Sequence, residues 1–157
     1  MTKARWDIEV RPRMTPRFAY VAAAIMVAVN VVLAILLPVK PTGVIYRTAD
    51  QVAFVLLGLV LGGAILLFTR PRLRVGPPGV AVRNLFGYRV LPWSEVIDVS
   101  LHPGARWARV DLPDDEYVPA MAIQLVDKEH AADAMERVRE RVAYYKAQHQ
   151  SKTRSAN

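Results

Sequence analysis

The 157-residue sequence contains no cysteine. This absence excludes disulfide bonds, thiol nucleophiles and zinc sites built on cysteine. Histidine is scarce as well, and the three present (His102, His130 and His149) are too scattered to have the spacing of metal ligands. The sequence also lacks a nucleophile–base set, a phosphate-binding loop and a pair of carboxylates suited to acid–base chemistry. We therefore expect a protein that is not an enzyme and that uses no metal or cofactor.

Charge is missing from two long stretches, residues 18–37 and residues 52–68. A helix of about 20 residues rises roughly 30 Å, which matches the hydrocarbon core of a bilayer. Both stretches therefore predict transmembrane helices, joined by a link over residues 38–51 in which Pro38 ends the first helix. A signal peptide is the alternative for the first stretch, but the stretch is long and no small-residue cleavage site follows it.

Small residues in the two stretches predict close packing of the helices. Gly58 and Gly62 form a GxxxG pattern, and Ala24 and Ala28 are the matching small positions of the first helix. The simplest interpretation is a hairpin packed within one chain, and a homodimer through the same face is the alternative. We expect Asn30, the one strongly polar side chain in the first stretch, to link the two helices by hydrogen bonding.

Acidic residues are fewer than basic ones, 14 against 21, and the excess lies beside the apolar stretches. Residues 1–17 carry five cations and two acids, whereas the link carries two cations and one acid. Cationic flanks favour the cytoplasmic side of a membrane. We expect a multi-pass cell-membrane protein with both termini in the cytoplasm, a basic arm over residues 1–17 lying on the inner leaflet, and a disordered tail over residues 149–157. The placement of the charge favours contact with the lipid bilayer over binding of nucleic acid.

From residue 70 the apolar residues alternate with polar ones, which is typical of strands. Turn residues divide this region into about six to seven short antiparallel strands; in the last of them Met121, Ile123 and Leu125 are expected to face inward. A helix over Lys128–Gln148 should follow, with Asp127 as its N-cap. The predicted fold is therefore a transmembrane hairpin followed by a compact domain over residues 70–148.

Two short motifs carry a resemblance to a known family. Residues 79–84 read GVAVRN and residues 91–96 read LPWSEV. Together with the two helices ahead of them, they resemble the actinobacterial membrane-anchored PH-domain family, also labelled low-molecular-weight protein antigen, over about residues 15–148. The resemblance implies a PH-like domain, in which antiparallel strands form a barrel or sandwich closed by one C-terminal helix.

Trp93, in the second motif, is expected to pack in the core beneath the C-terminal helix. Trp107 is the candidate contact residue for a partner. Phosphoinositide-binding PH domains gather lysines and arginines around their first hairpin; here that region offers Arg72, Arg74 and Arg83 but no lysine, so the match is poor.

Two functions follow as hypotheses. The first is a membrane-tethered module at the inner leaflet that binds a protein or peptide partner, through a groove near Trp107 or an unpaired sheet edge. The alternative is a lipid-handling component whose headgroup site is a basic concavity of Arg72, Arg74, Arg83 and Arg89. The alternation of the arginines with core positions favours the first.

Overall fold

The computed structural model of the chain describes residues 5–36 and 47–154. It divides into two compact units, one formed by residues 15–69 and the other by residues 1–14 together with 70–157. Most of the predicted link between the helices, residues 38–46, lies outside the described residues.

The first unit contains two long apolar helices, α1 (Met14–Leu36) and α2 (Thr48–Leu66), with a short helix η2 (Leu67–Thr69) after α2. By length and composition both long helices are able to cross a membrane. Each begins about four residues before the predicted stretch. The prediction counted uncharged residues alone, whereas a helix continues through polar residues such as Arg17 and Asp50.

The two helices approach each other closely at the predicted glycines. A Cβ atom added to Gly58 would lie 2.6 Å from the Cβ of Asn30, and one added to Gly62 would lie 3.0 Å from a methyl of Val27. The predicted partner positions Ala24 and Ala28 are wrong, because both are exposed, whereas Ala23 is buried. The first helix therefore packs on the second through Ala23, Val27 and Asn30, and not through the expected stripe of Ala24 and Ala28.

The expected hydrogen bond from Asn30 to the second helix is not found among the residues that the structure describes. The side-chain amide of Asn30 donates to the backbone oxygen of Met26 in its own helix, at 2.9 Å. The asparagine is buried, 7% exposed, and faces the backbone of Gly58, which offers no side-chain acceptor. A carbonyl one turn back within the same helix is a partner that a short polar side chain can always reach.

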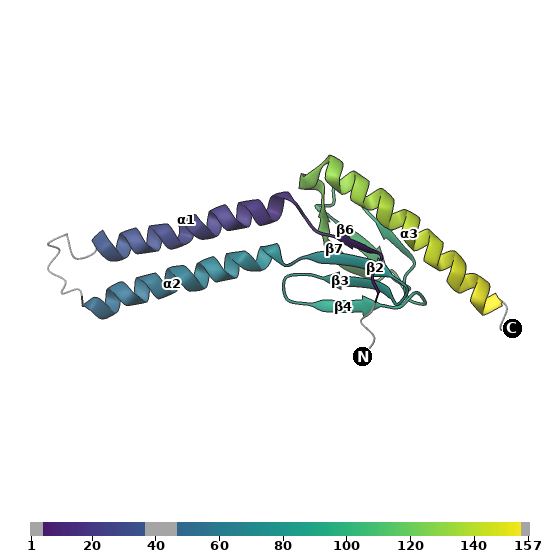
Figure 1. The fold of residues 1–157 in the computed structure, drawn as a ribbon, viewed down its shortest axis with the longest axis horizontal. Helices are drawn as coiled ribbons and strands as arrows, with labels where there is room; N and C mark the ends of the chain where they lie inside the picture. The colour runs from purple at the N-terminus through teal and green to yellow at the C-terminus, as the bar shows by residue number, and fades with distance from the viewer. Residues whose placement is uncertain (1–4, 37–46, 155–157) are drawn as a thin grey trace. The chain divides into compact units, whose positions relative to one another are not determined.

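The second unit contains two antiparallel sheets and one long helix (Figure 1). The first sheet has the order β1-β2-β3-β4 and the second the order β5-β6-β7. The strands are β1 (Ile8–Val10), β2 (Arg72–Gly76), β3 (Gly79–Arg83), β4 (Tyr88–Leu91), β5 (Asp98–Ser100), β6 (Trp107–Asp111) and β7 (Tyr117–Gln124). A short helix η3 (Leu125–Asp127) leads into α3 (Glu129–Arg154). The predicted fold class is confirmed.

The predicted N-terminal arm is wrong in one respect, because it contains strand β1. Val10 pairs with Leu73 and Ile8 with Val75, and Val10 is only 3% exposed. Three residues of alternation are too short to predict a strand, but β2 offers an edge for them to complete. The α1–α2 hairpin is therefore inserted between two neighbouring strands of one sheet, and the domain begins before α1.

The core lies between the two sheets and α3. Its buried side chains come from all seven strands and from the predicted stripe of α3, which includes Met135, Val138 and Val142. The helix does not end at Gln148 but continues to Arg154, so residues 149–154 are not the disordered tail expected. The Ser151 hydroxyl donates to the Gln148 carbonyl in this last part of the helix.

Strand β7 faces the core in a different register from the predicted one. Ile123 is buried as predicted, but Ala120 and Ala122 are buried with it in place of Met121, and Leu125 is 54% exposed. The pairing of β6 with β7 contains an irregularity between Trp107 and Ala108. A bulge changes which residues face inward on either side of it, and strict alternation cannot foresee this.

Candidate functional site

Three of the four predicted arginines gather on one face of the first sheet. Arg72 lies directly opposite Arg83, and Arg74 follows two residues after Arg72 on the same face. Glu9 of β1 pairs with Arg74 and its carboxylate contacts two guanidinium groups, Arg74 at 2.6 Å and Arg11 at 2.5 Å. Burial alone would raise the pKa of Glu9, but the hydrogen bonds from Arg11 and Arg74 outweigh it and hold that pKa below its ordinary value.

Arg72 is the least satisfied member of this cluster. Its Nε atom is buried, and no hydrogen-bond partner for it exists among the residues that the structure describes. The pKa of Arg72 is lowered, first by burial and then by the positive charge of Arg11, with smaller effects from Arg83 and Arg74. The carboxylate of Glu9 acts in the opposite direction, and a guanidinium group among several cations favours a further anion as its partner.

Arg89 does not join the cluster, so the predicted concavity of four arginines is wrong. Arg89 pairs with Val82, whereas Arg83 pairs with Tyr88. Residues that pair across two strands share a face, and successive residues alternate between faces. Arg89 therefore lies on the face opposite Arg72 and Arg83, at the free edge of the sheet.

Trp93 lies in the core. Its ring is 9% exposed, stacks on Tyr145 of α3 with 5.2 Å between centroids, and donates its indole N–H to the backbone oxygen of Gly76 at 3.1 Å. The Tyr145 hydroxyl in turn donates to Asp7, and burial followed by that carboxylate raises the pKa of Tyr145. Trp93 thus joins α3 to the turn between β2 and β3.

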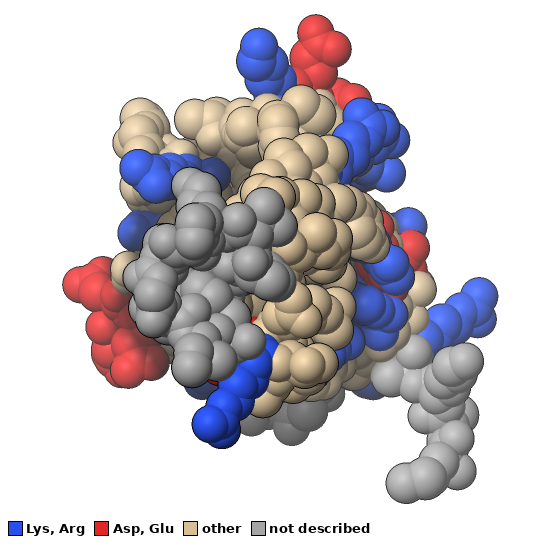
Figure 2. Space-filling view, turned by 90° about the vertical axis from the view of Figure 1, so that its left-hand side faces the viewer, with Lys and Arg blue, Asp and Glu red and all other residues tan. Residues whose placement is uncertain are grey.

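Trp107, the predicted contact residue, begins β6 and is 39% exposed. It belongs to the second sheet, whereas the arginine cluster belongs to the first. The structure therefore places the two predicted contact regions on different sheets. In the space-filling view, lysines and arginines project in several separate groups with acidic residues among them (Figure 2).

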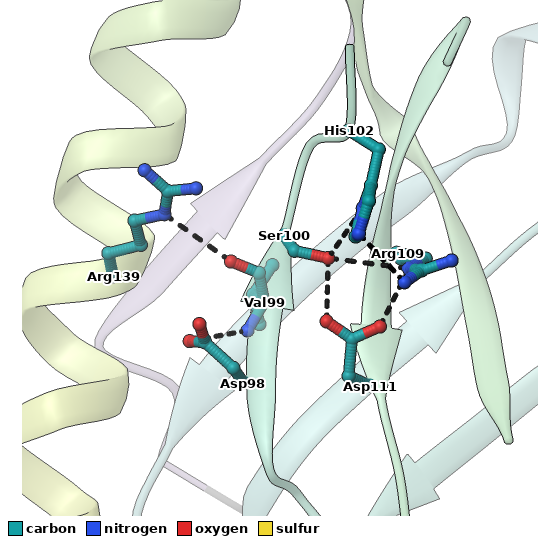
Figure 3. Close-up of polar contacts among 7 residues, drawn as sticks. All are labelled: Asp98, Val99, Ser100, His102, Arg109, Asp111 and Arg139. Carbon is teal, nitrogen blue, oxygen red and sulfur yellow. Dashed lines mark hydrogen bonds and ion pairs between the residues drawn. The ribbon is translucent and has the colours of Figure 1, made fainter. Parts of the chain in front are cut away.

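A polar cluster on β5 and β6 was missed by the sequence analysis. Arg109 contacts Asp111 at 2.7 Å and His102 at 2.9 Å, and the Ser100 hydroxyl donates to Asp111 at 2.6 Å (Figure 3). The alternation of β5 places Ser100 and His102 on one face, but the sequence does not contain the register that brings Arg109 and Asp111 beside them.

The cluster does not have the order of a catalytic triad. The carboxylate contacts the serine and not the histidine, and the arginine occupies the far side of the imidazole. Because Nε2 of His102 accepts from Arg109, Nδ1 carries the proton and donates to Ser100, at 3.2 Å. To act as a general base toward Ser100, His102 would have to accept the serine proton at Nδ1, which already carries a proton. This geometry therefore fits a structural network that joins β5 to β6.

The free edge of β5 is covered by side chains. The backbone N–H of Val99 donates to the carboxylate of Asp98 at 2.7 Å, and the oxygen of Val99 accepts from Arg139 of α3 at 3.4 Å (Figure 3). Lys146 of α3 donates to the oxygen of Ile97. An extra strand would have to displace all three contacts, and capping of this kind protects a sheet edge.

Strand β4, by contrast, is the last strand on its side of the first sheet, and it is exposed. Tyr88 is 58% and Val90 42% exposed, and Phe86 in the preceding turn is 89% exposed. The backbone N–H of Asn84 donates to the backbone oxygen of Gly87, so these two residues form a hydrogen-bonded pair next to the β3–β4 ladder. Hydrogen-bonded and non-hydrogen-bonded pairs alternate from there along the two strands. By that alternation the backbone groups of Tyr88 and Val90 point away from β3. The edge of β4 is therefore open to pairing.

Comparison with known proteins agrees with this architecture. Residues 70–141 match the model of a family described as bacterial PH domain. Uncharacterized proteins of Mycobacterium tuberculosis strains H37Rv and CDC 1551 and of Mycobacterium bovis are each 57% identical to the chain over 141 residues, covering 90% of this chain and 92% of the relative. No solved structure matches the chain. The chain therefore belongs to the family of these mycobacterial proteins and is a bacterial PH-domain protein.

Proposed function

We propose that this protein is a non-enzymatic interaction module, held at the inner leaflet by the α1–α2 hairpin, that binds an extended segment of a partner protein along β4. The observation that carries the proposal is the contrast between two sheet edges. The edge of β5 is capped by Asp98, Arg139 and Lys146, whereas β4 is exposed and carries apolar side chains. An exposed strand edge binds peptides by adding one strand to the sheet.

The insertion of the hairpin supports the proposed tether. Val10 precedes α1, Leu73 follows α2, and the two residues pair in one sheet. Residues that pair must lie on the same side of a membrane, so the helices either cross it as a pair or do not cross it at all. Their length and apolar composition, with side chains that are mostly exposed, favour crossing.

A proline at position 90 tests the proposal. Val90 has an outward N–H, so Val90→Pro removes a donor that a bound strand needs while leaving the β3–β4 ladder intact. A photo-crosslinking residue at Tyr88 should capture a partner in cells, and Val90→Pro should abolish the adduct. The matched control places the crosslinker at Tyr144, which is 50% exposed on α3. An adduct at position 88 that persists in Val90→Pro would contradict pairing along β4.

A second function is favoured by Arg72. Its buried Nε, for which the described residues supply no hydrogen-bond partner, lies near the charges of Arg11 and Arg83 and favours a phosphate oxygen, so an anionic lipid headgroup is the alternative ligand. Titration of the full chain in neutral detergent with short-chain phosphatidylglycerol should then shift the NMR signal of the Arg72 Nε–H. Arg83→Gln should weaken this binding, and Arg89→Gln, on the other face, should not.

A further inference from the structure

Phe86, Leu125 and Val126 are large apolar side chains that are exposed outside the strands and the three long helices, as is Ile97 beside β5. Phe86, in the turn between β3 and β4, is 89% exposed. Leu125 and Val126, in η3 before α3, are 54% and 53% exposed. None of them belongs to the core, and none belongs to the arginine cluster or to the polar cluster of β5 and β6. Exposed apolar side chains that share one end of a domain indicate a contact surface.

Both turns lie at the end of the domain from which the chain passes into the hairpin. The pairing of Arg72 with Arg83 places the β3–β4 turn at the end of the sheet where β2 begins. Only two residues separate Arg72 from Thr69, the last residue of η2, so their Cα atoms are at most about 11 Å apart. The register of the sheet thus places Phe86 at the end of the domain where β2 begins.

The other turn is held at the entrance to the first helix. The carboxylate of Asp127 accepts hydrogen bonds from the backbone N–H groups of Arg13, at 3.0 Å, and Met14, at 2.8 Å. Leu125 and Val126 immediately precede this aspartate. Within the domain, the β3–β4 turn and the start of α3 lie at the same end (Figure 1).

Charge differs between the two ends of the domain. Exposed cations accompany the apolar turns, with the exposed acid Glu129 next to them: Arg13 and Arg70 beside the helices, Lys128 after η3, and Arg106, whose oxygen accepts from Leu125 N–H at 3.0 Å. The opposite ends of the sheets carry the neutral turn between β2 and β3 and the acidic loop over residues 113–116. A cationic surface with apolar side chains matches an anionic lipid–water interface.

We propose that Phe86, Leu125 and Val126, with Arg70, Arg106 and Lys128 around them, form a membrane-contacting rim. This rim docks on the anionic lipid surface of the membrane that the hairpin crosses, and it thereby fixes the orientation of the domain. The inference rests on the proposed membrane tether. It concerns residues other than β4 and Arg72, so it is separate from both ligand proposals.

The absence of cysteine allows a direct test on the full chain. Single cysteines at Phe86, Val126, Pro77 and Leu59 are labelled with the dye NBD after reconstitution into vesicles of phosphatidylcholine and phosphatidylglycerol. We expect blue-shifted emission, quenched by nitroxide-labelled lipid, at positions 86 and 126. Pro77, in the turn between β2 and β3, is the matched aqueous control, and Leu59, in α2, reports insertion of the hairpin.

Each other outcome is decisive. Labels at 86 and 126 that behave like the label at 77, while position 59 is in lipid, overturn the rim and leave the tether standing. An aqueous label at position 59 overturns both. Labels at 86 and 126 that are shielded from iodide but not quenched by nitroxide lipid indicate a protein cover and overturn the lipid surface as occupant. Equal quenching in vesicles of phosphatidylcholine alone overturns the role assigned to the cations.

Discussion

Trp93 makes contacts with two elements that are distant in the sequence. Its ring stacks on Tyr145 of α3 and its N–H bonds to Gly76 at the end of β2. The packing expected from the sequence agrees with this placement, although the ring contact that the structure shows is to Tyr145. The residue's burial and its single polar contact inside the domain indicate a structural role.

We predict that Trp93→Ala destabilises the domain by about 3–5 kcal/mol, because truncation of a buried tryptophan leaves a cavity. The change is best measured by thermal unfolding of the full chain in detergent, since β1 belongs to the domain and a fragment starting at residue 70 would lack it. Trp107→Ala should have a small effect, because Trp107 is 39% exposed. A Trp93→Ala protein that melts like the parent but fails to bind a partner would place Trp93 on a binding surface instead.

Glu9 makes the attachment of β1 dependent on pH. Its pKa is lowered in the folded protein, so its carboxylate adds stability at neutral pH, and this stability is lost as the pH falls below about 4.3 and through the folded pKa. Glu9→Gln should therefore lower the melting temperature at pH 7, and this difference should shrink as the pH falls below about 4.3 and through the lowered folded pKa. Asp133→Asn, on the exposed face of α3, is the control. A difference that stays constant with pH would show that the ion pairs with Arg11 and Arg74 do not stabilise β1.

Asp127 shows where inference from local sequence stops. An aspartate ahead of an amphipathic helix predicts an N-cap, and the position fits that pattern. In the structure its carboxylate instead accepts from Arg13 and Met14, where α1 begins. The residue type and the chemistry were predictable, because a carboxylate suits the start of a helix. The identity of the helix that Asp127 caps was not predictable, because Arg13 and Met14 lie 114 and 113 residues before it in the sequence.

At the scale of elements, the helix pair offers a test with a matched control. A side chain at Gly58 or Gly62 would meet Asn30 or Val27, whereas a Cβ at Gly63 meets nothing within 4 Å. We predict that Gly58→Ile with Gly62→Ile separates the helices, because neither contact leaves room for a branched side chain, and that Gly63→Ile does not. The distance between spin labels on Val32 and Leu56 measures this separation.

An unchanged label distance in the double variant would refute close packing through these glycines. Gel filtration of the same variants tests the homodimer alternative. Loss of a dimer with an unchanged distance within the chain would show that the glycines serve contacts between chains.

Alternation of apolar residues predicts strands well but not their pairing. It indicated a run of short strands from residue 70 onward, where the structure has β2 to β7. It did not reveal that β1 joins the sheet or that Arg89 turns away from Arg83, because both depend on contacts between strands. For the same reason the openness of β4 and the capping of β5 by α3 could not be predicted from the sequence.

At the scale of the whole molecule, the arginine asymmetry predicts both termini in the cytoplasm. With one cysteine introduced at Thr42 or at Ser151, an impermeant thiol reagent should label intact cells only at Thr42. Thr42 lies in the predicted external link, outside the described residues, and Ser151 lies near the end of α3. Labelling of Ser151 and not Thr42 would reverse the orientation, and equal labelling after cell lysis confirms that both sites are reactive.

The pairing of β1 with β2 has a consequence for biosynthesis. The ribosome makes β1 first, yet its partner β2 emerges only after both α1 and α2 have been synthesised. If the helices span the membrane as proposed, a chain that inserted only one of them would leave β1 and β2 in different compartments, and the first sheet would lack its edge strand. Completion of the domain thus depends on correct insertion of the hairpin, and a wrongly threaded chain exposes an unfinished sheet that proteases can recognise.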